Sequence, residues 1–172
     1  IKACQQAEVK LMIHQNFRFQ PFPLHLKKML AENALGKIFY ARIFHRVLFQ
    51  VKALPVARLG KDAIEMRHQP FYINDGNLVL QHMAIHHLDT ARFLFGEPKR
   101  LHVSLRHANP IMKGEDHALI LLEYPDMDCL IEESWVTRGD EQIGFRIEGE
   151  KGSAENINDQ FLTFNADGSF HH

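Results

Sequence analysis

The second half of the chain is a succession of short strand-like segments separated by tight turns, and this feature constrains the fold most. The predicted strands cover residues 99–107, 117–124, 129–138, 142–149 and 153–157, with a last one near 161–165. The segments YPDMD (124–128) and GEKGS (149–153) are rich in Pro, Asp and Gly, which favour turns. Because tight turns join consecutive strands in opposite directions, we expect a largely antiparallel sheet.

The first half adds helices and two further strands. Residues 1–8 have the spacing of the end of an amphipathic helix, and VKLMIHQ (9–15) is typical of a short buried strand. LHLKKMLAENALG (24–36) predicts an amphipathic helix in which Gly36 is the left-handed cap. The alternating segment 37–50 predicts a long strand.

A further helix is expected to open at Asp75-Gly76 and to end at Gly96. Strands grouped together with few helices favour an α+β fold. We therefore predict an open, largely antiparallel sheet with helices on one face.

Composition limits the possible partners of the chain. The net charge of −1 over 172 residues gives no reason to expect nucleic acid or an acidic membrane surface. No apolar run approaches the roughly 18 residues of a membrane span. Cys4 and Cys129 lie far apart in the sequence, which fits a reduced, cytoplasmic protein. These features are those of an ordinary globular protein.

The segment LVLQHMAIHHLD (78–89) places polar residues in an apolar helix. At about 100° per residue, the side chains of His82, His86 and Asp89 share one narrow face. His87 projects to the opposite face, which we expect to pack on the sheet. We therefore interpret His87 as a structural, hydrogen-bonded histidine.

The spacing alone leaves three interpretations of the shared face. The first is a solvated or internally hydrogen-bonded polar stripe. The second is a metal site, because two histidines at i and i+4 with a nearby carboxylate have the spacing of zinc or iron ligands. The third is acid–base chemistry, since histidine exchanges protons near neutral pH.

Four segments together extend the interpretation beyond spacing. These are AEVKLMIHQNFRFQP, LKKMLAENALGKI, DGNLVLQHMAIHHLDTARFLFGEP and FRIEGEKGSAE, in that order. In this order and spacing the chain resembles the second half of the Gfo/Idh/MocA family of NAD(P)-dependent sugar and polyol dehydrogenases. The resemblance implies hydride transfer between nicotinamide and a sugar, polyol or related hydroxy compound, with NAD or NADP as cofactor.

The same resemblance implies a domain organisation. Residues 1–16 are expected to be the remnant of an N-terminal dinucleotide-binding domain of the Rossmann type. Residues 17–172 are expected to form the C-terminal substrate and dimerisation domain. The family's Gly-rich phosphate loop and its catalytic Lys would precede Ile1, so this chain alone is expected to be inactive.

The resemblance also assigns roles to individual residues. His86 matches the family's proton-transfer histidine, and Asp89 matches a carboxylate that we expect to orient its imidazole. His82 stands where the family usually has Asp, which is a departure. Asn16 and Arg18 fall at the linker that the family brings near the nicotinamide.

Other residues are assigned by position. Arg58, Lys61 and Arg67 lie in a long basic loop and are expected to bind substrate. Trp135 is expected in the core or at a subunit interface. We predict no resident metal.

Two further functions stay open. One is a non-catalytic scaffold of the same fold, which the departure at His82 favours. The other is a metal-dependent lyase or hydrolase that uses His82 and His86.

An uncovered sheet face predicts a homodimer or homotetramer.

Overall fold

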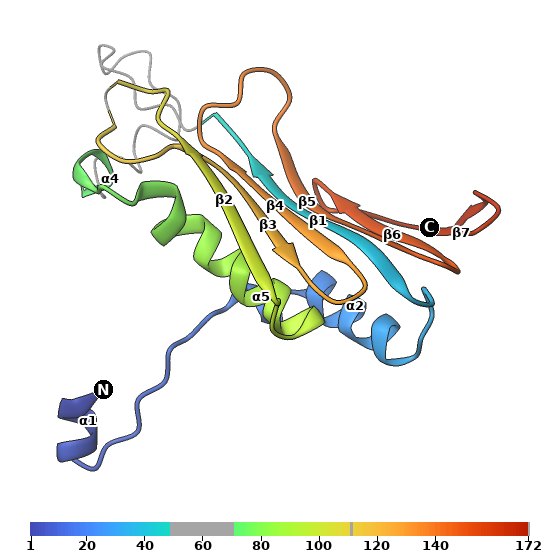
Figure 1. The fold of residues 1–172 in the computed structure, drawn as a ribbon, viewed down its shortest axis with the longest axis horizontal. Helices are drawn as coiled ribbons and strands as arrows, with labels where there is room; N and C mark the ends of the chain where they lie inside the picture. The colour runs from blue at the N-terminus through green and yellow to red at the C-terminus, as the bar shows by residue number, and fades with distance from the viewer. Residues whose placement is uncertain (49–70, 111, 172) are drawn as a thin grey trace.

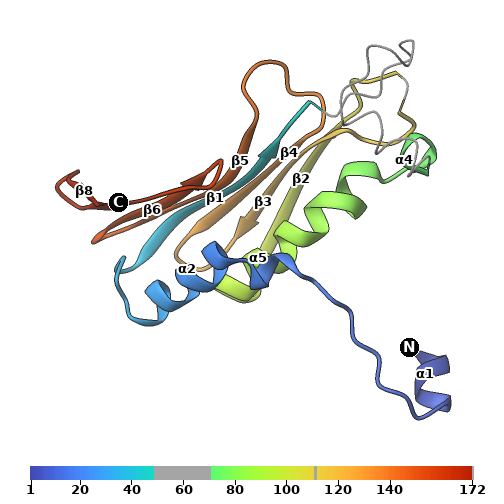
Figure 2. The same ribbon diagram turned by 180° about the vertical axis from the view of Figure 1, so that it is seen from behind.

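The computed structural model describes residues 1–48, 71–110 and 112–171, and Arg58, Lys61 and Arg67 lie outside these ranges. The described chain forms one large sheet with helices on one face, as Figures 1 and 2 show from opposite sides. The predicted α+β class is therefore confirmed.

The sheet has eight strands in the order β2-β3-β4-β1-β5-β6-β7-β8. Their bounds are β1 Ile38–Arg46, β2 Arg100–Arg106, β3 His117–Glu123, β4 Asp128–Ser134, β5 Gln142–Gly149, β6 Gly152–Ile157, β7 Gln160–Asn165 and β8 Phe170–His171. β1 runs parallel to β4, and the other neighbouring pairs are antiparallel. Both predicted hairpin turns are present, between β3 and β4 and between β5 and β6.

The helical segments lie at the N-terminal end of the chain and on one face of the sheet. They are α1 Lys2–Gln6, η1 Phe17–Phe19, α2 Pro21–Ala31, α4 Phe71–Asn74, the π-helical turn η3 Leu80–Ala84 and α5 Ile85–Phe95. α2 and α5 lie side by side against the sheet, whereas α1 projects away from it (Figures 1 and 2).

Alternation along the strands explains which face the helices cover. On β1, Ala41 and Ile43 are fully buried, and on the neighbouring β4 so is Ile131. Successive strand side chains point to opposite faces, so these residues line the face under α5. Charged side chains such as Arg42 occupy the other face, which no helix covers in the described part of the chain.

α5 rests on this apolar face through a stripe at helical spacing. Its buried residues are His87, Thr90, Ala91 and Leu94. The small side chain of Ala91 lets the helix approach the strands closely. The prediction that His87 lies on the buried face is confirmed, with 3% of the residue exposed.

The predicted strand at residues 9–15 is wrong. Residues 9–16 form an extended arm, and Val9, Leu11, Met12 and Ile13 are 53–75% exposed. A strand requires a hydrogen-bonded neighbour, and no described segment pairs with this arm.

The bounds of α2 also differ from the prediction. The helix begins at Pro21, whose fixed φ suits the first helical position, and ends at Ala31. The left-handed residue just beyond it is Asn33 with φ 54°, while Gly36 has φ 71° three residues later. Gly36 therefore shapes the entry to β1 instead of capping the helix.

The histidine helix contains a π-helical turn that the sequence pattern did not predict. Residues Leu80–Ala84 adopt this wider turn, and regular α-helix begins at Ile85. A π turn closes i to i+5 hydrogen bonds, so the angle of about 100° per residue does not hold across it. The predicted common face of His82, His86 and Asp89 is therefore altered at His82.

Burial of the inner sheet face yields a stability prediction. Ile120 on β3 is 1% exposed, whereas its cross-strand partner Val103 on β2 is 45% exposed. We expect Ile120→Ala to lower the free energy of unfolding by about 3 kcal/mol, because it leaves a cavity. Val103→Ala, the matched control, should cost less than about 1 kcal/mol. Urea denaturation of both variants measures the difference, and equal losses would contradict the assigned packing.

Candidate active site

The end of the arm and η1, residues 15–19, form a linker that crosses α5. His86 lies at this crossing. Its Nδ1 is 2.8 Å from Oε1 of Gln15, and its ring stacks on Phe17 with ring centroids 4.4 Å apart. When Nδ1–H donates to the amide oxygen, Nε2 keeps its lone pair. Burial and the nearby charge of His87 lower the pKa of His86, while Asp89 opposes this shift. The imidazole is therefore held ready to accept a proton.

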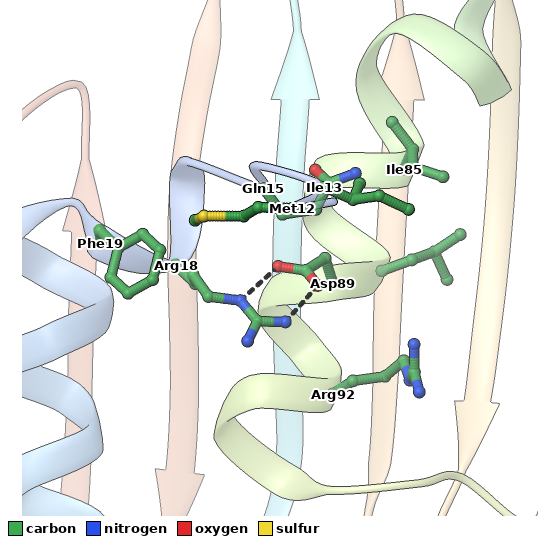
Figure 3. Close-up of a pocket in the computed structure, with 9 residues that line it drawn as sticks. Met12, Ile13, Gln15, Arg18, Phe19, Ile85, Asp89 and Arg92 are labelled. Carbon is green, nitrogen blue, oxygen red and sulfur yellow. Dashed lines mark hydrogen bonds and ion pairs between the residues drawn. The ribbon is translucent and has the colours of Figure 1, made fainter. Parts of the chain in front are cut away.

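Asp89 binds Arg18 and makes no hydrogen bond to His86 among the described residues. Nε of Arg18 donates to Asp89 over 2.7 Å, and a second guanidinium nitrogen donates to the other carboxylate oxygen (Figure 3). Asp89 was expected to orient the imidazole, and in the structure its hydrogen bonds go to Arg18. The hydrogen bond to Asp89 raises the pKa of Arg18. This bidentate pair fixes η1 to α5.

The two linker residues expected near a cofactor occupy different settings. Arg18 is engaged with Asp89 and lies over the ring of Phe93, 5.5 Å from its centroid. Asn16 precedes η1 and is exposed, and its carbonyl accepts the backbone N–H of Phe19. The guanidinium of Arg18 is therefore engaged in holding the linker against α5.

His82 is directed toward a different partner from His86. Its Nε2 is 2.7 Å from Oδ2 of Asp75, and Tyr72 meets its ring edge-on with centroids 4.6 Å apart. The N–H of Asn77 and then His82 lower the pKa of Asp75. The predicted single stripe is therefore corrected: the π-helical turn places His82 in a separate cluster.

This separation bears on the metal interpretation. Within residues 1–48, 71–110 and 112–171, no three His, Cys, Asp or Glu side chains converge as a metal site would require. His82 and His86 have separate hydrogen-bond partners, Asp75 and Gln15.

A third cluster lies under α5 and was only partly predicted. Nδ1 of His87 is 2.5 Å from Oε1 of Glu133, whose side chain is fully buried on β4. Nδ1 of His45 on β1 lies 4.0 Å from the other oxygen of Glu133. Sequence reasoning missed Glu133 and His45. The alternation of Cys129, Ile131 and Glu133 along the predicted strand was the signal that would have found the carboxylate.

The charge states of this cluster follow from burial. Burial raises the pKa of Glu133, and the charge and hydrogen bond of His87 oppose the shift. Burial and the charge of His87 lower the pKa of His45 to about 4. His45 therefore stays neutral at physiological pH.

Two cavities flank α5. The first, of about 570 Å³, lies on the arm side and is drawn in Figure 3. The second, which we call the chamber, has a volume of about 800 Å³ and lies between η1, α5 and the sheet. Its lining includes Phe17, Phe22, His45, Met83, His87, Ile143, Phe145, Asn156, Asn158 and Asp159. The chamber is within the size range of small-molecule sites.

The described residues offer no cradle for a dinucleotide pyrophosphate. Arg18 and Arg92, which line the first cavity, are paired with Asp89 and Glu97. The chain also lacks a Gly-rich phosphate loop.

Trp135 is 4% exposed and packs on Tyr72, so it belongs to the core. In the part of the chain that the structure describes, no helix has the length and apolar character needed to span a membrane.

Comparison with known sequences identifies similar proteins. Residues 24–155 match the family model described as the GFO/IDH/MocA C-terminal domain. The chain is 34% identical over 124 residues to D-apiose dehydrogenase of Paraburkholderia graminis, which covers 72% of this chain and 29% of that protein. It is 30% identical over 139 residues to D-apiose dehydrogenase of Rhizobium rhizogenes, with 80% and 36% covered. The chain thus spans about a third of the length of these relatives.

Solved structures share the fold. An oxidoreductase from Agrobacterium radiobacter in complex with NAD+, L-tartaric acid and magnesium superposes with a TM-score of 0.79 at 26% identity, covering 99% of this chain and 48% of that one. An inositol dehydrogenase homologue from Azotobacter vinelandii, complexed with NADH and myo-inositol, gives a TM-score of 0.74 at 18% identity, covering 99% and 44%. At this lower identity the likeness concerns the fold alone.

The neutral state of His45 yields a pH prediction. Its pKa falls from 6.5 to about 4 on folding, so the unfolded chain binds more protons between these values. This contribution to stability is complete above pH 6.5 and is lost as the pH falls toward 4. Wild type should therefore lose about 3 kcal/mol more than His45→Gln over this range. Denaturant unfolding at a series of pH values measures this, and parallel profiles would refute the assignment.

Proposed function

Because this chain belongs to the GFO/IDH/MocA family and carries its C-terminal domain, we propose that it is the substrate-binding half of an NAD-dependent oxidoreductase. The proposed substrate is a sugar, polyol or related hydroxy compound. The relatives named D-apiose dehydrogenase and the NAD+ complex at 26% identity support both points.

The observation that carries this proposal is the setting of His86. The imidazole is half-buried, has a lowered pKa, and is fixed between Gln15 and Phe17 at the crossing of linker and helix. A neutral imidazole with Nδ1 engaged presents Nε2 as a base. We assign to His86 the removal of the hydroxyl proton during oxidation.

When bound, the nicotinamide takes up the hydride that leaves the carbinol carbon. The residues of this chain do the remaining work. Nε2 of His86 receives the proton, and Gln15 and Phe17 fix the ring. Asp89 acts on His86 through its charge, which opposes the lowering of the pKa, and holds Arg18 so that the linker keeps its place. Asn16 is the linker residue left to face the cofactor.

The proposed organisation follows the expected one. Residues 1–16 belong to a dinucleotide-binding domain that holds NAD, with NADP as the alternative, and residues 17–172 form the substrate domain. The exposed apolar side chains of Val9, Leu11, Met12 and Ile13 support this, since they need a partner surface. The unpaired thiols of Cys4 and Cys129 support a cytoplasmic location.

We place Arg58, Lys61 and Arg67 at the substrate on the strength of the basic loop sequence alone. We assign His82, paired with Asp75, a supporting role at the substrate. A non-catalytic scaffold is the second candidate function, because His82 stands where the family has Asp. A measurement of turnover distinguishes the dehydrogenase from the non-catalytic scaffold.

The test of function uses the protein that joins this chain to its dinucleotide-binding domain. Incubation with D-apiose and NAD+ should produce NADH, followed by absorbance. His86→Asn should lower kcat by about 100-fold, because the proton acceptor is lost. His102→Asn is the matched control, since His102 is exposed on β2 and pairs with Glu123. Absence of turnover with a panel of sugars and polyols would favour the scaffold.

The uncovered sheet face is the proposed homodimer or homotetramer surface. It carries Leu119, which is 38% exposed and lies opposite the partly buried Ser104. We expect Leu119→Asp to lower the molecular mass measured by sedimentation, because a charge enters the interface. Leu101→Asp, on the opposite sheet face, should leave it unchanged. A monomeric wild type would contradict this proposal.

A further inference from the structure

Buried ionisable groups cluster beside the chamber, where His45 and His87 line it and Glu133 lies behind them. Glu133 is 0% exposed, His87 is 3% exposed, and His45 lies beside both. Oε2 of Glu133 and Nδ1 of His45 have no hydrogen-bond partner among the described residues. Burying a carboxylate with an unsatisfied oxygen is costly, and an apolar side chain would pack more favourably. The cluster therefore indicates a use other than packing.

The carboxyl group of Glu133 fixes the orientation of His87. Nδ1 of His87 lies 2.5 Å from Oε1 of Glu133, so this nitrogen is engaged by the carboxyl group and Nε2 is the ring nitrogen left for a ligand. The ring lines the chamber. Phe17 and Phe145 hold the ring from two sides, with centroids 5.7 Å and 6.2 Å from that of His87.

The remaining lining indicates which ligands the chamber accepts. Asn156 contributes a carboxamide, and Phe17 and Phe145 contribute apolar faces. The carboxamide of Asn158 is engaged by the backbone of Glu141 and Ile143. Asp159 at the rim is exposed. No Lys or Arg lines the chamber in the described ranges, so nothing there compensates a carboxylate or phosphate. Imidazoles and amides instead suit hydroxyl groups, which both donate and accept.

We propose that the chamber binds the hydroxyl groups of an uncharged polyhydroxy ligand, and that Nε2 of His87, oriented by Glu133, accepts a hydrogen bond from one of them. This proposal rests on the proposed function and adds that His86 and His87 have different roles. His86 removes the reacting proton on the linker side of α5, whereas His87 binds a second hydroxyl on the sheet side. Within the described lining, the absence of Lys and Arg and the exposed carboxylate of Asp159 disfavour anionic hydroxy acids.

The experiment compares two probes with the same four-carbon skeleton. Threitol is uncharged, and L-tartrate carries carboxylates in place of its two terminal CH2OH groups. Nitrogen NMR of the histidine rings of the joined protein reports binding without hydride transfer. We expect threitol, at millimolar concentration, to shift the Nε2 signal of His87, and L-tartrate to leave it unchanged. A shift with L-tartrate, or none with threitol, would overturn the proposal.

Glu133→Gln supplies the second arm. Gln keeps the shape but no longer holds Nδ1 through a carboxyl group, so threitol should bind about tenfold more weakly. In turnover with D-apiose, this variant should raise KM and leave kcat nearly unchanged, unlike His86→Asn. Glu32→Gln is the control, because Glu32 is exposed and pairs with Lys28 at the end of α2, away from the chamber.

The two proposals fail in different ways. Threitol binding at His87 without any NADH formation would refute the dehydrogenase and keep the chamber. Turnover with an unchanged KM in Glu133→Gln would keep the dehydrogenase and refute the chamber. If Glu133→Gln does not fold, His87→Gln replaces it and should show the same rise in KM.

Discussion

The contact between α5 and the inner face of the sheet is the constraint on which the site depends. The small side chain of Ala91, and that of Ala84 at the end of η3, bring the helix close to the strands, and the hydrogen bond between His87 and Glu133 fixes it laterally. With this face of the helix buried, His86 must point toward the linker. The ion pair of Arg18 and Asp89 then fixes the linker against the same helix. Of these two adjacent histidines, His87 lines the chamber, whereas His86 contacts Gln15 and Phe17 of the linker.

The buried cluster of Glu133, His87 and His45 lowers the stability of the fold, and we relate this loss to its role in ligand binding. A carboxylate sealed beside two imidazoles lowers stability relative to an apolar core. The same burial keeps His45 neutral and holds His87 in one orientation. Perturbed ionisable groups beside a cavity are typical of functional sites. The division between a proton-transferring His86 and a ligand-binding His87 accounts for why an apolar helix carries both.

Local pattern predicted most of the fold. The strands of the second half, their hairpin turns and the buried face of α5 follow from alternation and helical spacing, which are properties of neighbouring residues. The arm was mispredicted because Val9 to Ile13 have strand character but pair with no strand among the described residues. The π-helical turn was missed because apolar periodicity does not distinguish it from an α-helical turn. His82 consequently joins Asp75 instead of His86.

The site was less predictable than the fold because its contacts join distant parts of the chain. Arg18 and Asp89 are 71 residues apart, and His87 and Glu133 are 46 apart. Only the alternation of the strand at 129–138 pointed to Glu133. The central claim is that α5 presents His86 to the reaction and His87 to the bound ligand. A crystal structure of the joined protein with NAD+ and D-apiose tests it most directly. We predict one sugar hydroxyl at Nε2 of His87 and the reacting one at His86; a sugar bound outside the chamber would contradict the account.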